Sequence, residues 1–263
     1  MNRLARSAAA FLFPSRCLLC EQSELEAFFR GGICDGCWKA IPALAAPRCE
    51  RCDESVPTAD PALCGRCLLE PPEFRSLRSA AAYRGRARDL LLLFKFRGAD
   101  YLAPHLARLL VGRLSSGQLA DEVTAVPARR LERLRRDHAA EILAAGVARE
   151  LGLPFEPRRL EKLRPTRRQS GLPLAQRAVN VAGAFGARAE APRRILLIDD
   201  VATSGATARA CARALRRAGA ETVYVWCFAR ATRDDEIAFD VRRSTFDVEE
   251  PELPKVSDEE RRT

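Results

Sequence analysis

The stretch Ile195–Leu215 (ILLIDDVATSGATARACARAL) constrains the fold of this chain more than any other. Ile195–Ile198 is a short unbroken apolar run, as in a central parallel strand that is covered on both faces. Asp199 and Asp200 come directly after this run, and a helix is expected over roughly Ala206–Ala218. This order predicts a parallel α/β protein with a ligand site at the carboxyl edge of its sheet.

The turn between the aspartates and the helix has small side chains and three hydroxyl groups, in Thr203, Ser204 and Thr207. The helix directs free N–H groups and the positive end of its dipole into the turn, which favours a phosphate by about 0.3–2 kcal/mol. No Lys follows Gly205 and no G-x-G-x-x-G occurs here, so the turn is not a Walker P-loop. Carboxylates beside a phosphate site suit a phosphorylated sugar. The alternative is an ordinary polar strand end with a glycine helix cap.

This segment resembles the ligand-binding motif of the type I phosphoribosyltransferases. The resemblance implies that fold, a mostly parallel twisted sheet flanked by helices, and a site for phosphoribosyl pyrophosphate (PRPP) with Mg²⁺. In that family the two aspartates contact the ribose, and here they would stabilise a cationic transition state. The following turn wraps the 5′-phosphate. The implied site comprises Asp199, Asp200, Val201, Ala202, Thr203, Ser204, Gly205, Ala206 and Thr207.

Eight of the ten cysteines form four C-x-x-C pairs near the amino terminus. Two such pairs supply the four thiolates of a closed tetrahedral zinc site, so the pattern predicts two structural zinc ions. About fifty residues build little core, and structural zinc contributes roughly 10–16 kcal/mol in small fingers. Disulfides are the alternative, without a convincing export signal to support them. Sequential and interleaved pairing both remain open, with sequential pairing the simpler. The expected ligands are Cys17, Cys20, Cys34, Cys37, Cys49, Cys52, Cys64 and Cys67.

Composition changes along the chain indicate three parts: a zinc-ribbon module at 11–70, a phosphoribosyltransferase-like domain at 77–230 and an acidic tail at 231–263. Pro71-Pro72 marks the first boundary. The tail holds eleven acidic and six basic residues and is predicted to be disordered. The whole chain carries a formal charge of +9, which suits polyanionic ligands, either diphosphates or nucleic acid. No apolar run approaches the ~18 residues of a membrane helix, so we expect no membrane insertion and a cytoplasmic location.

Between the cysteines and the aspartates the pattern predicts further strands and helices. The expected strands are Leu77–Tyr83, Glu122–Val126, Leu153–Glu156 and, after the aspartates, Thr222–Phe228; the expected helices are Ala87–Phe96, Tyr101–Leu114 and Asp137–Leu151. The loop after Pro127 carries Arg129, Arg130, Arg133, Arg135 and Arg136, which could chelate a pyrophosphate or form a solvated face beside Glu132. Arg164–Phe185 is polar and irregular, as in a mobile lid. Cys211 and Cys227 are predicted to be core residues.

Taken in order, the four cysteine pairs, YRGRARDLLLLFKFRG, the VP strand end with spaced arginines, R-x-x-x-x-Q-x-x-L…R-x-x-N…F and DDVATSGAT give a narrower resemblance. The chain resembles the ComF family, double-zinc-ribbon phosphoribosyltransferase-like proteins linked to natural competence and DNA uptake, from Phe11 to about Arg230. Candidate pyrophosphate or lid residues are Lys95, Arg129, Arg130, Arg164, Gln169, Arg177 and Asn180, with Leu172 also matching. Where the family has R-G-F-N-Q, this chain has Arg136-Asp137-His138-Ala139-Ala140. This difference puts the diphosphate-binding side of the implied site in question. His138 is either a solvated or capping residue or a general base.

Two functions follow. In the first, PRPP binds with Mg²⁺ and a nucleophile displaces its pyrophosphate; the acceptor is not readable, nor is it readable whether transfer occurs at all. In the second, the protein is a non-catalytic adaptor whose zinc ribbons and Arg-rich surface hold single-stranded DNA beside DNA-uptake proteins.

Overall fold

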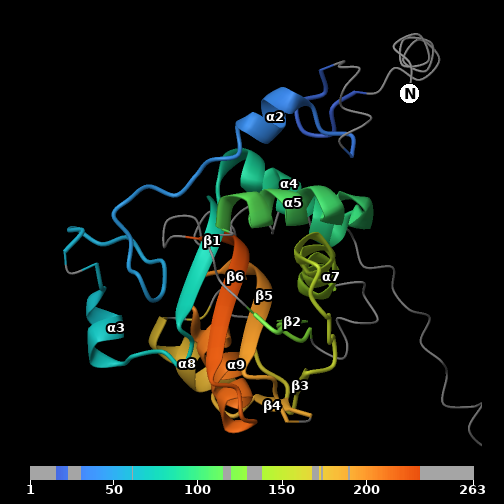
Figure 1. Ribbon diagram of the computed structural model, residues 1–263. Helices are drawn as coiled ribbons and strands as arrows, with labels where there is room; N and C mark the ends of the chain where they lie inside the picture. Colours follow the sequence, from blue (N-terminus) through green and yellow to red (C-terminus); the bar gives the residue numbers. More distant parts are fainter. Residues whose placement is uncertain are drawn as a thin grey trace, which may run out of the picture.

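The centre of the molecule is a four-stranded parallel sheet in the order β1-β6-β5-β2 (Figure 1). The structure is a computed structural model that describes residues 16–22, 31–60, 62–114, 120–128, 138–167, 172, 174–188 and 190–231. The strands are β1 (Ser76–Ala82), β2 (Glu122–Ala125), β5 (Arg194–Ala202) and β6 (Thr222–Arg230). The predicted parallel α/β fold is confirmed.

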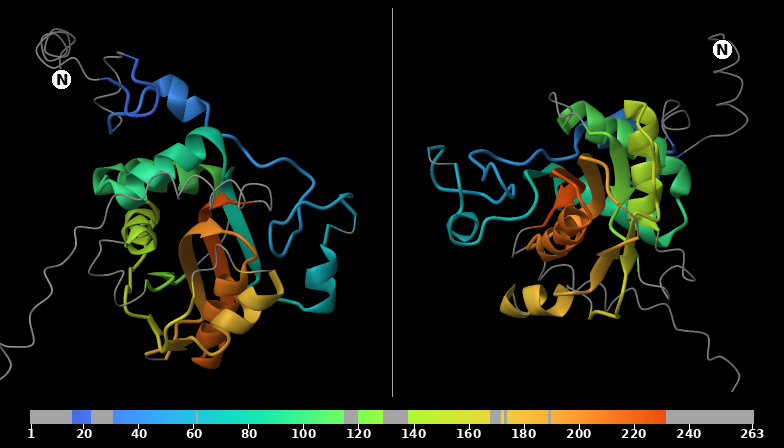
Figure 2. Two further views of the ribbon diagram at one scale, coloured as in Figure 1. Left: turned by 180° about the vertical axis from the view of Figure 1, so that it is seen from behind. Right: turned by 60° about the horizontal axis from the view of Figure 1, so that its bottom comes forward.

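Helices cover both faces of this sheet, and the apolar run of β5 explains why (Figures 1 and 2). Leu196 and Ile198 pack into one core with α4 (Gly85–Phe96), α5 (Ala103–Leu114) and α7 (Ala139–Leu151). Ile195 and Leu197 alternate with them and pack into the other core with α9 (Ala206–Arg217). A strand buried on both faces therefore needs apolar residues at every position. The 3-10 turn η2 (Asp100–Leu102) leads into α5.

A second, two-stranded antiparallel sheet pairs β3 (Leu160–Lys162) with β4 (Phe185–Ala187). The helix α8 (Leu174–Val181) lies in the segment between them, so the lid predicted to be irregular contains regular structure. The prediction of a strand at Leu153–Glu156 is wrong. This segment forms one isolated parallel bridge, between Phe155 and Val123, and no continuous ladder. That segment runs beside the short edge strand β2, which offers few pairing positions.

The two cysteine clusters pack on opposite faces of the sheet. Cys17 and Cys37, with α2 (Asp35–Lys39), belong to the core that contains α4 and α5. Cys49 and Cys67, with α3 (Gly65–Leu69), belong to the core that contains α9. The zinc-ribbon segments thus extend the two hydrophobic layers. The predicted tail at 231–263 lies outside the described residues apart from Ala231. Within the described ranges, no helix is both long and apolar enough to cross a bilayer.

Candidate functional site

Asp199 and Asp200 lie inside β5, not beyond its end as predicted. The strand continues to Ala202 because β6 runs alongside it and pairs Val201 with Ala229 and Ala202 with Arg230. Both aspartates are half-buried, and the Asp200 amide donates to Asp199 Oδ1 at 2.9 Å. Neighbouring strand residues point to opposite faces of a sheet, so local backbone bonding, not shared orientation, keeps the two carboxyl groups in one region.

The two carboxyl groups have different surroundings. Burial and the neighbouring Asp200 together raise the pKa of Asp199 to about 8, against the opposing effect of Lys95. Lys95, at the end of α4, forms an ion pair with Asp200 Oδ2. At neutral pH Asp199 can therefore donate a hydrogen bond, while the Asp200 oxygens accept. Sugar hydroxyl groups, which both donate and accept, are suited to such a pair.

The turn that follows is shaped by Gly205, which precedes α9 with a φ of +71°. A β-carbon there would meet only Leu77 Cδ1, at 3.9 Å, so the need for glycine is conformational. Ser204 Oγ accepts from the Ala206 amide at 3.3 Å. Helix geometry leaves the other first-turn amides of α9 without intrahelical partners, which favours an anion. Thr203, Ser204 and Thr207 are half-buried and so retain some access to solvent.

The second cysteine cluster braces this turn. Arg66 of α3 donates to the Ser204 carbonyl at 2.7 Å. Arg209 of α9 donates to the Glu70 carbonyl at 2.8 Å and lies 3.5 Å from Cys67 Sγ. Its guanidinium also lies over the Phe74 ring, 6.0 Å from the centroid. These contacts could not be predicted from the sequence, because a single arginine beside a cysteine pair carries no sign of its distant partner.

The cysteines group sequentially, as Cys17/Cys20/Cys34/Cys37 and Cys49/Cys52/Cys64/Cys67, with the sulfur atoms of each group within 4.8 Å of one another. The Sγ–Sγ distance is 3.8 Å for Cys17–Cys37 and 3.6 Å for Cys52–Cys64. A tetrahedron with zinc–sulfur bonds of about 2.3 Å has edges of about 3.8 Å, so both groups fit structural zinc. All eight are free thiols, against the disulfide alternative.

The remaining predicted site residues divide into two groups. Arg164 donates to the carbonyls of Asn180 and Ala182, Arg177 donates to the Leu172 carbonyl, and the Asn180 side chain binds the Arg167 backbone. These three lid side chains hold the lid's own backbone, and their role toward a ligand stays a prediction.

Arg129, Arg130 and Gln169 lie outside the described residues, as do Arg133, Arg135, Arg136 and Asp137. His138 occupies the N-cap position of α7 without a capping hydrogen bond from its side chain, and its Nδ1 lies 3.9 Å from Glu141 Oε2. Cys211 and Cys227 are fully buried, as predicted.

Asp199→Asn is expected to change how stability depends on pH. An acid with a raised folded-state pKa contributes stability that is present below its unfolded value, near 3.8, and is lost as pH rises through about 8. The melting temperature of Asp199→Asn relative to wild type should therefore rise between pH 4 and 8. Asp121→Asn is the control that should show no trend between pH 4 and 8, because Arg194 lowers the pKa of Asp121 and its contribution to stability changes only below its usual value of 3.8. A constant difference between Asp199→Asn and wild type across this range contradicts the raised pKa.

Comparison with known proteins agrees with this geometry. The double zinc ribbon domain family matches residues 8–68. The chain is 34% identical over 228 residues to the DNA utilization protein YhgH of Salmonella typhimurium, covering 82% of this chain and 97% of that protein. It is 30% identical over 230 residues to competence protein F of Haemophilus influenzae, covering 83% of this chain and 98% of that protein.

Solved structures similar to this one include glutamine PRPP amidotransferase from B. subtilis (25% identity, TM-score 0.37, 52% of this chain and 30% of that chain). Adenine phosphoribosyltransferase from Leishmania tarentolae is a second, with 16% identity and a TM-score of 0.34 over 54% of this chain and 76% of that chain. The fold is a parallel α/β sheet with an amino-terminal double zinc ribbon. The chain belongs to the ComF family, together with the DNA utilization protein YhgH and competence protein F.

Proposed function

We propose that this protein binds PRPP or a related phosphoribosyl ligand at the carboxyl edge of β5. The observation that carries the proposal is the succession of two adjacent aspartates, one of them paired with Lys95, and a glycine turn at the amino end of α9. The 5′-phosphate binds the amides of the turn over Thr203–Thr207, and the ribose hydroxyls bind Asp199 and Asp200.

Mg²⁺ fits this arrangement, because it prefers carboxylate and phosphate oxygens and retains several of its waters. Asp199 and Asp200 are the residues that would hold it, and its charge would neutralise the diphosphate. Lys95 already balances Asp200 in the structure. A diphosphate near Asp200 therefore competes with that ion pair and draws the lysine toward itself.

The proposed biological setting is DNA uptake and utilization, which rests on the names of the relatives. The cytoplasmic location remains a prediction from the sequence. Those names equally favour a second candidate, a non-catalytic adaptor for single-stranded DNA. The two differ in a measurable way: an adaptor's affinity for an oligonucleotide falls steeply as salt rises. Measuring pyrophosphate release from PRPP with Mg²⁺ shows separately whether transfer accompanies binding.

Calorimetric titration with PRPP and Mg²⁺ tests the proposal. Wild type should bind, and Asp199→Asn/Asp200→Asn should weaken binding by about a hundredfold or more, because two charged or hydrogen-bonding partners are lost at once. Asp121→Asn is the matched control: it makes the same chemical change next to β2, where Asp121 pairs with Arg194.

That control should bind PRPP like wild type. Absence of PRPP heat from the wild-type protein contradicts the proposed function. A wild-type protein that binds an oligonucleotide at low salt but releases no heat with PRPP supports the adaptor.

A further inference from the structure

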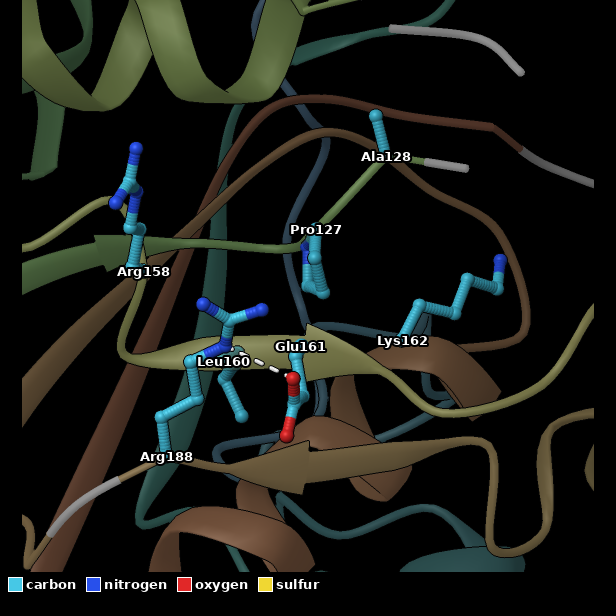
Figure 3. A pocket seen from close by; sticks show the side chains of 7 residues that line it. All are labelled: Pro127, Ala128, Arg158, Leu160, Glu161, Lys162 and Arg188. Carbon is cyan, nitrogen blue, oxygen red and sulfur yellow. Dashed lines mark hydrogen bonds and ion pairs between the residues drawn. The ribbon is translucent and has the colours of Figure 1, made fainter. Parts of the chain in front are cut away.

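A cavity of about 320 Å³ lies between the β3–β4 sheet and the segment that follows β2 (Figure 3). Arg158, Lys162 and Arg188 line it together with one acid, Glu161. Pro127 and Leu160 supply its apolar surfaces. None of the motifs that indicated the phosphoribosyl site includes the charged side chains of this cavity.

The Pro127 wall of the cavity lies at the carboxyl end of β2. In the parallel ladder Ala125 pairs with Ile198, and the Val126 amide donates to the Ile198 carbonyl at 2.9 Å. Continuing this register places Val126 beside Asp199 and Pro127 beside Asp200. Ligands of open α/β sheets bind outside the carboxyl ends of adjacent strands, and Pro127 and the aspartates share that edge of the sheet.

The charges in the cavity are unequal. Arg188 Nε pairs with Glu161 Oε2 at 2.8 Å, which neutralises that acid. Figure 3 shows Arg158 on the same side of the cavity as Arg188 and Lys162 on the opposite side, with Pro127 between them. Lys162 Nζ also lies 5.4 Å from the centre of the Phe185 ring. Three cationic side chains and one acidic side chain make this an electropositive cavity, and part of its wall is apolar.

We propose that this cavity binds a second ligand, a small molecule with an apolar or planar body and a carboxylate or phosphate group. The guanidinium of Arg158 would bind the anionic group bidentately, and Lys162 would add a point charge from the other side. The body would lie between Pro127 and Leu160. That this ligand is the companion of a phosphoribosyl ligand rests on the proposed function; the binding itself does not.

The test uses phenyl phosphate and benzoate as probes of the zinc-loaded full chain, with neutral benzamide as the uncharged comparison. Wild type should bind both anions and not benzamide. Arg158→Gln/Lys162→Gln should weaken anion binding at least about tenfold and leave PRPP binding unchanged. Arg108→Gln/Arg149→Gln, at exposed arginines of α5 and α7, removes the same net charge and should behave like wild type.

Thr207→Asp separates the cavity from the phosphate turn, because it places a negative charge where PRPP is proposed to bind while suiting the helix dipole. It should abolish PRPP binding and leave phenyl phosphate binding intact. Anion binding that is lost in Thr207→Asp but kept in Arg158→Gln/Lys162→Gln overturns the cavity proposal. So does a decanucleotide whose binding depends on Arg158 and Lys162 when neither small anion binds. If PRPP fails to bind while phenyl phosphate behaves as expected, the proposed function falls and the cavity stands.

Discussion

Removal of zinc with a strong chelator is expected to unfold both ribbon segments and to abolish ligand binding at the turn in the same titration. Structural zinc contributes roughly 10–16 kcal/mol in small fingers, which is comparable to the ~5–15 kcal/mol total stability of an ordinary domain. The cysteines are also part of both main cores, which contain Cys37 and Cys67 respectively. Circular dichroism and thermal unfolding, followed with metal content, measure the change.

The two clusters should differ in their effect on the ligand. Cys64→Ser disrupts the cluster whose neighbour Arg66 holds the Ser204 carbonyl, whereas Cys20→Ser disrupts the cluster beside α4 and α5. Both cysteines are half-buried, so the two substitutions are matched in burial. Each variant should carry one zinc fewer than wild type. Cys64→Ser should weaken PRPP binding by the larger factor.

Equal effects of the two variants on PRPP affinity would mean that the Arg66 contact does not shape the turn. Retention of the ribbon structure after complete loss of metal would contradict the structural role of zinc. Addition of zinc in excess of the chelator should restore both structure and binding, which separates metal loss from irreversible aggregation.

Local sequence signals predicted the parts of this molecule in which neighbouring residues determine structure. The C-x-x-C spacing predicted which eight cysteines come together in two groups, and the glycine turn before α9 lies where it was expected. Helix bounds differ by a few residues: α4 begins at Gly85, not Ala87, and α7 begins at Ala139, not Asp137. The predicted end of β5 was wrong, because the point where the strand ends depends on its pairing with β6.

Other features could not be read from the sequence for the same reason. β3 and β4 have three residues each, too few for a periodic pattern, and they pair across the whole lid. The electropositive cavity is formed when Arg158 and Arg188, thirty residues apart, meet at that small sheet. The contacts of Arg66 with the turn span 138 residues. Long-range contacts of this kind leave no local trace in composition or spacing.

Arg230→Met is expected to lower stability by about 1–3 kcal/mol, because it leaves the Cys52 carbonyl without its donor and buried Asp53 without a compensating charge. Arg230 is only 3% exposed at the end of β6. It donates to the Cys52 carbonyl at 2.6 Å and to Glu54 Oε2 at 2.5 Å. Its charge also lowers the pKa of Asp53, which burial raises. Methionine nearly matches the side chain's length but supplies no donor, so these groups lose their hydrogen bonds.

Urea unfolding of the zinc-loaded protein measures this loss, and Arg193→Met is the matched control. Arg193 also forms a bidentate pair, with Glu221, but both side chains are more than half exposed, so solvent replaces the partner and the midpoint should hardly move. Adding Asp53→Asn to Arg230→Met should recover part of the stability, because Asp53 is a buried carboxylate that Arg230 helps to compensate. Equal midpoints for Arg230→Met and Arg193→Met would show that burial of Arg230 adds nothing to stability, and that other contacts hold the ribbon to the sheet.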